Sequence, residues 1–176
     1  MDLFAYPLDT GTILQKKRSL KRQLLQTPGL VPKKVALLSG STIGEVKNIL
    51  EIFLLANGIQ PTFWEGGYGL FYENLMFDDG SLAAFAPDVI YIHTSQHNIK
   101  NRPCQSDSDA DVQAKLDAEF ARFESAAKAG LRFGCPVVLN NFDLPVYRVM
   151  GNREASAPRG KINFVRSLNC RLAQLA

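Results

Sequence analysis

Cysteine, histidine and tryptophan are scarce in this sequence of 176 residues, which has three cysteines, two histidines and one tryptophan. The cysteines are odd in number, widely spaced and form no C-x-x-C pair, which argues against both a disulfide framework and a zinc cluster. His93 and His97 have a spacing found in some metal sites, but no third ligand stands at a recognisable distance from them. We therefore expect free thiols and no bound metal.

Long apolar runs are also missing. The longest ones fall far short of the roughly 18 to 20 residues that a membrane span needs. The N-terminal stretch MDLFAYPLDT has no basic region followed by an apolar one, so it does not have the pattern of a signal peptide. With 46% hydrophobic and 21% charged residues, the sequence is typical of one soluble domain with a proper core. We expect a cytoplasmic protein without a membrane partner.

Positive charge is concentrated at the N-terminus. The net charge is +3, yet the first 34 residues carry seven cations against two acids, a net charge of +5. Such an arm can contact nucleic acid or acidic lipid, but Ile13, Leu20 and Leu24 stand near helical spacing with the cations mostly between them. The pattern favours a docked helix with solvated cations. We expect residues 1–34 to form a basic helical arm that binds no nucleic acid.

Strand and helix patterns alternate after this arm, without internal repeats. Strands are predicted at 35–40, 59–66, 87–95 and 135–142, and the clearest helices at 42–57, 108–130 and 161–176. Pro61 lacks the N–H that an interior strand donates, so the second strand should lie at an edge. Alternating elements with short apolar strands predict an α/β fold, a doubly wound parallel sheet between two helical layers.

Parallel sheets bind ligands at the carboxyl ends of their strands, which directs attention to the residues after each predicted strand. The sequence GSTIG after the first strand is neither G-x-S-x-G nor a P-loop. A hydroxyl at that position more often caps a helix than attacks a substrate, and Thr42 with Glu45 three residues later is typical of a capping box. Gly66 and Gly67 after the second strand permit either a tight turn or close approach to a ligand.

Two acidic motifs fail on their context. Asp107, Asp109 and Asp111 imitate a calcium loop, but valine stands at its sixth position and alanine at its twelfth. Asp109 and Asp111 also imitate the D-x-D-x-[TV] of haloacid-dehalogenase (HAD) phosphatases, whose first aspartate is a nucleophile at a strand end. Polar residues precede them here, so no strand can be drawn. We interpret these acids as the start of a helix, where they complement its dipole.

Four stretches taken together resemble the N-terminal region of FkbH-like proteins of HAD subfamily IIIC. They are KKVALLSGSTIGEV, FWEGGYGLFYENLMFDDGSLAAFAPDVIYIHT, PVVLNNFDLPVYRVMGNREAS and FVRSLNCRLAQL. The resemblance implies that residues 35–176 form an SGNH-hydrolase-like, flavodoxin-like domain and that a HAD domain lies downstream. It also implies a family role in transferring glyceryl or related acyl units to an acyl carrier protein, in polyketide or surface-polysaccharide biosynthesis. Mg²⁺ is expected only in that HAD domain, and no cofactor in this segment.

The SGNH comparison can be carried over residue by residue. Ser39, Gly40 and Ser41 match the Gly-Asp-Ser that holds the nucleophile, with only the serine kept. Gly66 or Gly67 matches the oxyanion glycine. His93, Thr94 and Ser95 stand where the oxyanion asparagine belongs, and the catalytic Asp/His pair has no counterpart in the chain. Ser41 and Thr42 are therefore vestigial candidates, and the predicted binding pocket comprises Ser39, Gly40, Ser41, Gly66, Gly67, His93, Thr94, Ser95 and Asn140.

The resemblance leaves three functional hypotheses. One is a non-catalytic docking module whose partner is an acyl carrier protein or the downstream HAD domain. The others are an ester hydrolase that uses Ser41 and a free-standing phosphatase. The SGNH-like strand order is 2-1-3-4-5, and no fifth strand follows the helix at 161–176. We therefore expect an incomplete domain whose strand at 137–141 is an exposed edge that can pair in a homodimer.

Overall fold

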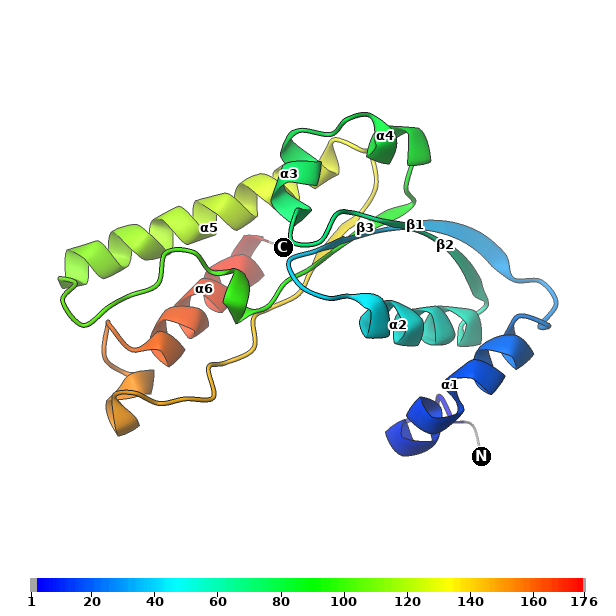
Figure 1. The fold of residues 1–176 in the computed structure, drawn as a ribbon, viewed down its shortest axis with the longest axis horizontal. Helices are drawn as coiled ribbons and strands as arrows, with labels where there is room; N and C mark the ends of the chain where they lie inside the picture. The colour runs from blue at the N-terminus through cyan, green and yellow to red at the C-terminus, as the bar shows by residue number, and fades with distance from the viewer. Residues whose placement is uncertain (1–2, 176) are drawn as a thin grey trace.

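Four parallel strands form the sheet at the centre of the protein, in a computed structural model that describes residues 3–175 (Figure 1). The strands are β1 (Val31–Ser39), β2 (Ile59–Glu65), β3 (Val89–His93) and β4 (Val137–Leu139), in the order β2-β1-β3-β4. All pairs are parallel. The predicted order of the first four strands is confirmed, and so are the edge position of the Pro61 strand and that of β4 among the described residues.

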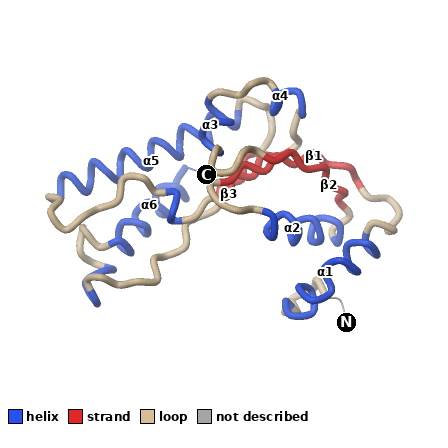
Figure 2. The backbone as a smooth tube through the Cα atoms, in the orientation of Figure 1, coloured by secondary structure: helices blue, strands red, loops and turns tan. Residues whose placement is uncertain are grey.

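Six α-helices are described, together with two short 3₁₀ helices. They are α1 (Thr10–Leu24), α2 (Gly44–Ala56), α3 (Phe71–Met76), α4 (Ser81–Phe85), α5 (Asp109–Leu131) and α6 (Lys161–Leu175), with η1 at Gln96–Asn98 and η2 at Gly151–Ala155. In Figures 1 and 2, α2 lies on one side of the strands and α3 on the other. The three-layer α/β prediction is therefore confirmed. Within residues 3–175, every helix is too short or too polar to span a lipid bilayer.

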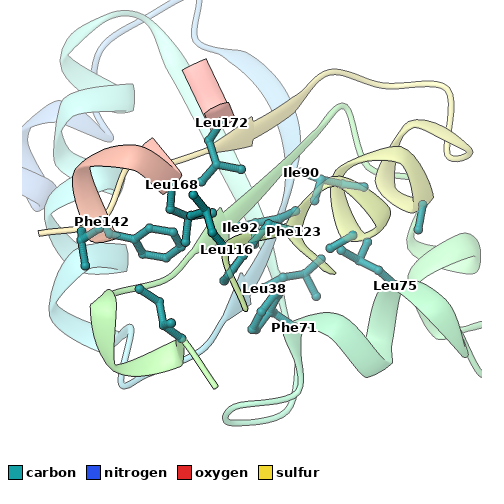
Figure 3. Packing of buried hydrophobic residues seen from close by; sticks show 14 of the residues in the cluster. Leu38, Phe71, Leu75, Ile90, Ile92, Leu116, Phe123, Phe142, Leu168 and Leu172 are labelled. Carbon is teal, nitrogen blue, oxygen red and sulfur yellow. The ribbon is translucent and has the colours of Figure 1, made fainter. Parts of the chain in front are cut away.

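The two faces of the sheet are covered unequally. Ala36, Leu38, Ile90 and Ile92 point into the main core, which also contains side chains of α3, α5 and α6 (Figure 3). We call this the covered face. Their neighbours along the strands point the other way, as alternation in a strand requires. On this side, which we call the α2 face, Val35 and Leu37 form a smaller apolar cluster with Ile43.

β1 begins at Val31, earlier than the predicted Val35. Residues 31–34 pair with β2 in register, from Val31 opposite Ile59, yet they are exposed. Their sequence, VPKK, has no buried side chain and therefore no apolar pattern that predicts a strand. These residues belong to β1 because their backbone pairs with β2. The sheet therefore includes the last residues of the predicted basic arm.

The predicted capping box at Thr42 is wrong. The N-cap of α2 is Ile43, and no side chain donates or accepts at this cap. Glu45 forms an ion pair with Lys17 of α1 at 2.5 Å instead. Glu45 thus pairs with a side chain of α1 and does not form the predicted capping box.

Within the basic arm, Thr10–Leu24 form a helix that packs on the rest of the protein. Ile13 and Leu20 of α1 are buried, while Leu24 is only partly so. Lys17 and Lys21 of α1 reach Glu45 and Glu51 of α2.

Gly130, expected to end α5, lies inside that helix, which runs to Leu131. A Cβ on Gly130 would lie 2.9 Å from a methyl group of Val137, so this glycine serves close packing on β4.

Candidate functional site

A row of polar side chains crosses the carboxyl ends of three strands. Ser39 of β1 pairs in register with His93 of β3, and Ile92 pairs with Leu139, so that Asn140 follows β4 level with His93. By alternation these three side chains lie on the α2 face. Ser39 is buried, and His93 and Asn140 are half-buried. The sequence-predicted pocket thus holds three residues that the tertiary structure does bring side by side.

His93 has one ring nitrogen engaged. Its Nδ1 atom and the Tyr91 hydroxyl, two residues earlier on the same face, are joined by a hydrogen bond of 2.9 Å. Burial lowers the pKa of His93 and raises the pKa of Tyr91. Both side chains are therefore neutral near pH 7, and the imidazole is available as a hydrogen-bond partner without a charge.

Asn140 joins the ends of β3 and β4. Its Oδ1 accepts from the Thr94 amide at 2.8 Å, and its Nδ2 donates to the Thr94 carbonyl at 2.7 Å. Asp143 accepts from the Gln96 amide at 3.0 Å. The Thr94 Oγ1 is buried without a hydrogen-bond partner among the described residues. Asn140 is thus a structural clamp as well as a member of the polar row.

The turn after β1 rests on the 3₁₀ helix η1. Asn98 donates from Nδ2 to the Gly40 carbonyl at 2.7 Å and accepts at Oδ1 from the Ser95 amide at 2.9 Å. A Cβ on Gly40 would come within 2.5 Å of the Asn98 amide group. Gly40 is therefore required for the approach of Asn98, not for a ligand. Ser95 completes a capping box with Asn98 at η1.

Gly66 and Gly67 have different surroundings. A Cβ on Gly66 would lie 2.6 Å from Asn74 Oδ1 and 2.9 Å from Leu38, so Gly66 serves close packing on α3. Asn74 Oδ1 is buried and has no hydrogen-bond partner in the described part of the chain. Gly67 is exposed and faces Leu70. These two glycines follow β2, and the Gly66 amide donates to the Leu37 carbonyl of β1 at 2.9 Å.

Ser41 and Thr42 lie in the turn between β1 and α2. Ser41 is partly exposed and Thr42 exposed. Neither hydroxyl has a hydrogen-bond partner among residues 3–175, and neither caps α2. His93 is engaged with Tyr91, and His97 lies exposed on η1. No base is therefore positioned on Ser41.

The acidic motif forms the start of α5, as predicted. Ser108 is the N-cap and makes a capping box with Asp111, whose Oδ2 accepts from the Ser108 hydroxyl at 2.6 Å. Asp109 faces Arg159 at 3.5 Å. These carboxylates stand at a helix N-terminus rather than at a strand end, which contradicts a phosphatase built on this pair. Across residues 3–175, no three His, Cys, Asp or Glu side chains gather closely enough to hold a metal ion.

The residues that hold the segment after β3 by hydrogen bonds were not identified from the sequence. Glu119 of α5 is fully buried, and its Oε1 accepts from the Lys100 and Asn101 amides at 3.1 and 2.8 Å. Its Oε2 accepts from Arg122 at 2.8 Å. A glutamate within the apolar stripe of α5 was the available signal. Tyr91 was also missed, because alternation alone places it on the α2 face but not beside His93.

Comparison with known proteins supports the fold. No protein-family model and no curated protein matches the sequence. A crystal structure described as the N-terminal part of the protein BF1531 from Bacteroides fragilis, containing a phosphatase domain and complexed with Mg, is similar with a TM-score of 0.73 and 18% identity. The match covers 90% of this chain and 42% of that one. The chain thus spans less than half of that structure, and the similarity is one of fold.

Proposed function

We propose that this chain is a non-catalytic binding and docking module, the N-terminal part of an FkbH-like protein of HAD subfamily IIIC. Its partner is an acyl carrier protein or the HAD domain of the same protein, and its setting is cytoplasmic. Two findings support the proposal: the sequence stretches that resemble this family, and a similar fold in a structure described as containing a phosphatase domain. In this proposal Mg²⁺ chemistry belongs to the HAD domain.

The observation that carries the proposal is the state of Ser41. A serine hydroxyl becomes a nucleophile only with a general base in hydrogen-bond reach. Among the described residues Ser41 has no such partner, and the Nδ1 of His93 is occupied by Tyr91. The Ser41 hydroxyl therefore has no group in place to accept its proton.

The polar row suits a neutral ligand. Ser39, His93 and Asn140 offer a hydroxyl, an uncharged imidazole and an amide at the end of an apolar face. The phosphopantetheine arm of a carrier protein carries two amides and a slender alkyl chain, which match such groups in kind. We propose that the row receives this arm when the carrier docks.

The expected lack of Ser41-dependent ester hydrolysis is tested with p-nitrophenyl acetate. We expect the intact protein and its Ser41→Ala variant to hydrolyse this ester at the same rate, because no base activates the hydroxyl. Ser106→Ala, which removes another surface hydroxyl, is the matched control. A rate that falls at least about tenfold in Ser41→Ala alone, with folding unchanged, contradicts the proposal and favours the ester hydrolase.

Carrier recognition is tested by calorimetric titration with an acyl carrier protein in its apo and holo forms. We expect the holo form to bind more tightly, and His93→Ala to reduce that advantage while leaving apo binding unchanged. Equal affinity of the two forms would contradict the proposed binding of the phosphopantetheine arm. Absence of binding by either form would remove the carrier protein as the partner.

A further inference from the structure

An apolar groove of about 870 Å³ runs along the α2 face. One wall is α2, and the floor consists of side chains from β1, β3 and β4. The lining residues are Leu14, Val35, Glu45, Val46, Ile49, Leu50, Phe53, Leu54, Val89, Tyr91, Val138 and Asn140. Val138 of β4 is 49% exposed and lies outside the apolar cluster that joins α2 to β1 and β3.

The wall of the groove has the geometry of one half of a helix pair. Val46, Ile49, Leu50 and Phe53 follow one another at helical spacing and form a ridge along α2. A second helix packed at the usual interaxial distance of about 8 to 10 Å would lie on Val89, Tyr91 and Val138. The groove therefore has the shape that an amphipathic helix fills with its apolar side chains.

One rim of the groove is basic. Leu14 of α1 lines the groove, and Arg18 and Arg22, four and eight residues later on the same side of α1, line the adjoining hollow that also contains Leu14. Arg18 and Arg22 have no ion pair among the described residues, whereas Lys17 and Lys21 are neutralised by Glu45 and Glu51. Glu45, the acid in the lining, is thus already paired. The charge left at this rim is positive.

We propose that the groove is the docking site for an acidic amphipathic helix of a partner protein. The apolar side of that helix packs on the α2 ridge and the strands, and its carboxylates face Arg18 and Arg22. This inference rests on the docking role proposed above, but not on which protein supplies the helix. A second copy of the chain is a poorer occupant, because its own cationic α1 would be brought to the same rim.

The probe is a fluorescein-labelled peptide of about 20 residues with leucines at i, i+3, i+4 and i+7 and glutamates elsewhere. We expect a saturable rise in fluorescence anisotropy that weakens as salt is raised. A scrambled peptide of the same composition should not bind. In ¹⁵N spectra of the full chain, the amides that shift should belong to α2, β3 and β4.

Two pairs of variants locate the site. Leu14 and Val138 are about half exposed, so Leu14→Asp with Val138→Asp should leave the fold intact and weaken binding about tenfold or more. Leu131→Asp, at an equally exposed leucine on α5, is its control. Arg18→Glu with Arg22→Glu should weaken binding and abolish its salt dependence, while Arg166→Glu on α6 should not.

The inference is overturned if the peptide does not bind, if the scrambled peptide binds equally well, or if Leu131→Asp matters as much as the groove variants. It is also overturned if the chain at the assay concentration is a dimer that excludes the peptide, or if anionic lipid vesicles bind this surface more tightly than the peptide. If the peptide binds but the carrier protein does not, the carrier protein is contradicted as the partner. The groove would still be supported as the docking site for an acidic helix.

Discussion

His93 combines three properties that matter at the scale of one residue. It ends β3, lies level with Ser39 and Asn140, and shares a hydrogen bond of 2.9 Å with Tyr91. Burial lowers its pKa, because the charged imidazolium loses hydration in the folded state. The polar row is consequently uncharged at neutral pH and becomes cationic only in acid.

Stability should follow the titration of His93. Between its lowered pKa and the ordinary value of about 6.5, the unfolded state binds more protons than the folded state. The free energy of unfolding should therefore be highest above about pH 6.5 and decrease as pH falls through the folded-state pKa. Denaturation between about pH 7.5 and pH 5, with the imidazole followed by NMR in a His97→Gln background, measures both quantities. A His93→Gln variant with the same pH dependence would contradict this assignment.

At the scale of elements, α5 holds the segment that follows β3. Glu119 accepts from the amides of residues 100 and 101, and Arg122 donates to the Asn98 carbonyl at 2.5 Å. Asn98 in turn holds the Gly40 carbonyl in the turn after β1. The position of the loops at the carboxyl edge is thus set by a charged pair inside the helical layer.

Loss of the Glu119 carboxylate should be costly. Glu119→Gln keeps the size of the side chain but leaves Arg122 without its buried counter-charge, so we expect a loss of about 2 to 4 kcal/mol in the free energy of unfolding. Glu124→Gln, which breaks an i,i+4 pair with Lys128 at the surface of the same helix, should cost about 0.5 kcal/mol or less. Urea denaturation of the two variants makes the comparison. Equal losses of unfolding free energy in the two variants would contradict a stabilising role of the buried Glu119 carboxylate.

At the scale of the whole molecule, the two faces of the sheet differ. α3, α5 and α6 bury one face in a continuous core, whereas on the other α2 leaves β3 and β4 partly open. β4 is also an edge strand in the described part of the chain. An open apolar face beside an unpaired edge is the arrangement that favours association.

The purified chain should therefore bind a hydrophobic dye and self-associate with rising concentration, with edge pairing through residues 137–141 as the predicted contact. Light scattering after size exclusion measures the mass, and dye fluorescence measures the open face. Val138→Lys should reduce both signals, whereas Lys substitution at Val146, an exposed apolar residue outside this strand, should not. A monomer at all concentrations that binds no dye would contradict this prediction.

The sequence by itself determined the types of the main elements, the edge position of β2 and the helical docking of Thr10–Leu24, whereas the order of the strands was implied by the SGNH-like resemblance. The element types and the edge position follow from short-range patterns: apolar runs in β1 and β3, the stripe on α5, and proline in β2. It also indicated Ser39, His93 and Asn140, because parallel strands place their carboxyl ends at one edge. The start of β1 and the cap of α2 were mispredicted, since long-range pairing decided both.

Only the tertiary structure decided which of the candidate residues meet. It showed that Gly40 and Gly66 allow close packing against Asn98 and Asn74, and that Ser39 and His93 lie opposite each other. It also joined the basic α1 to the apolar groove through Leu14. Spacing along the chain cannot specify such contacts, because they depend on how helices far apart in sequence pack on the two faces of one sheet.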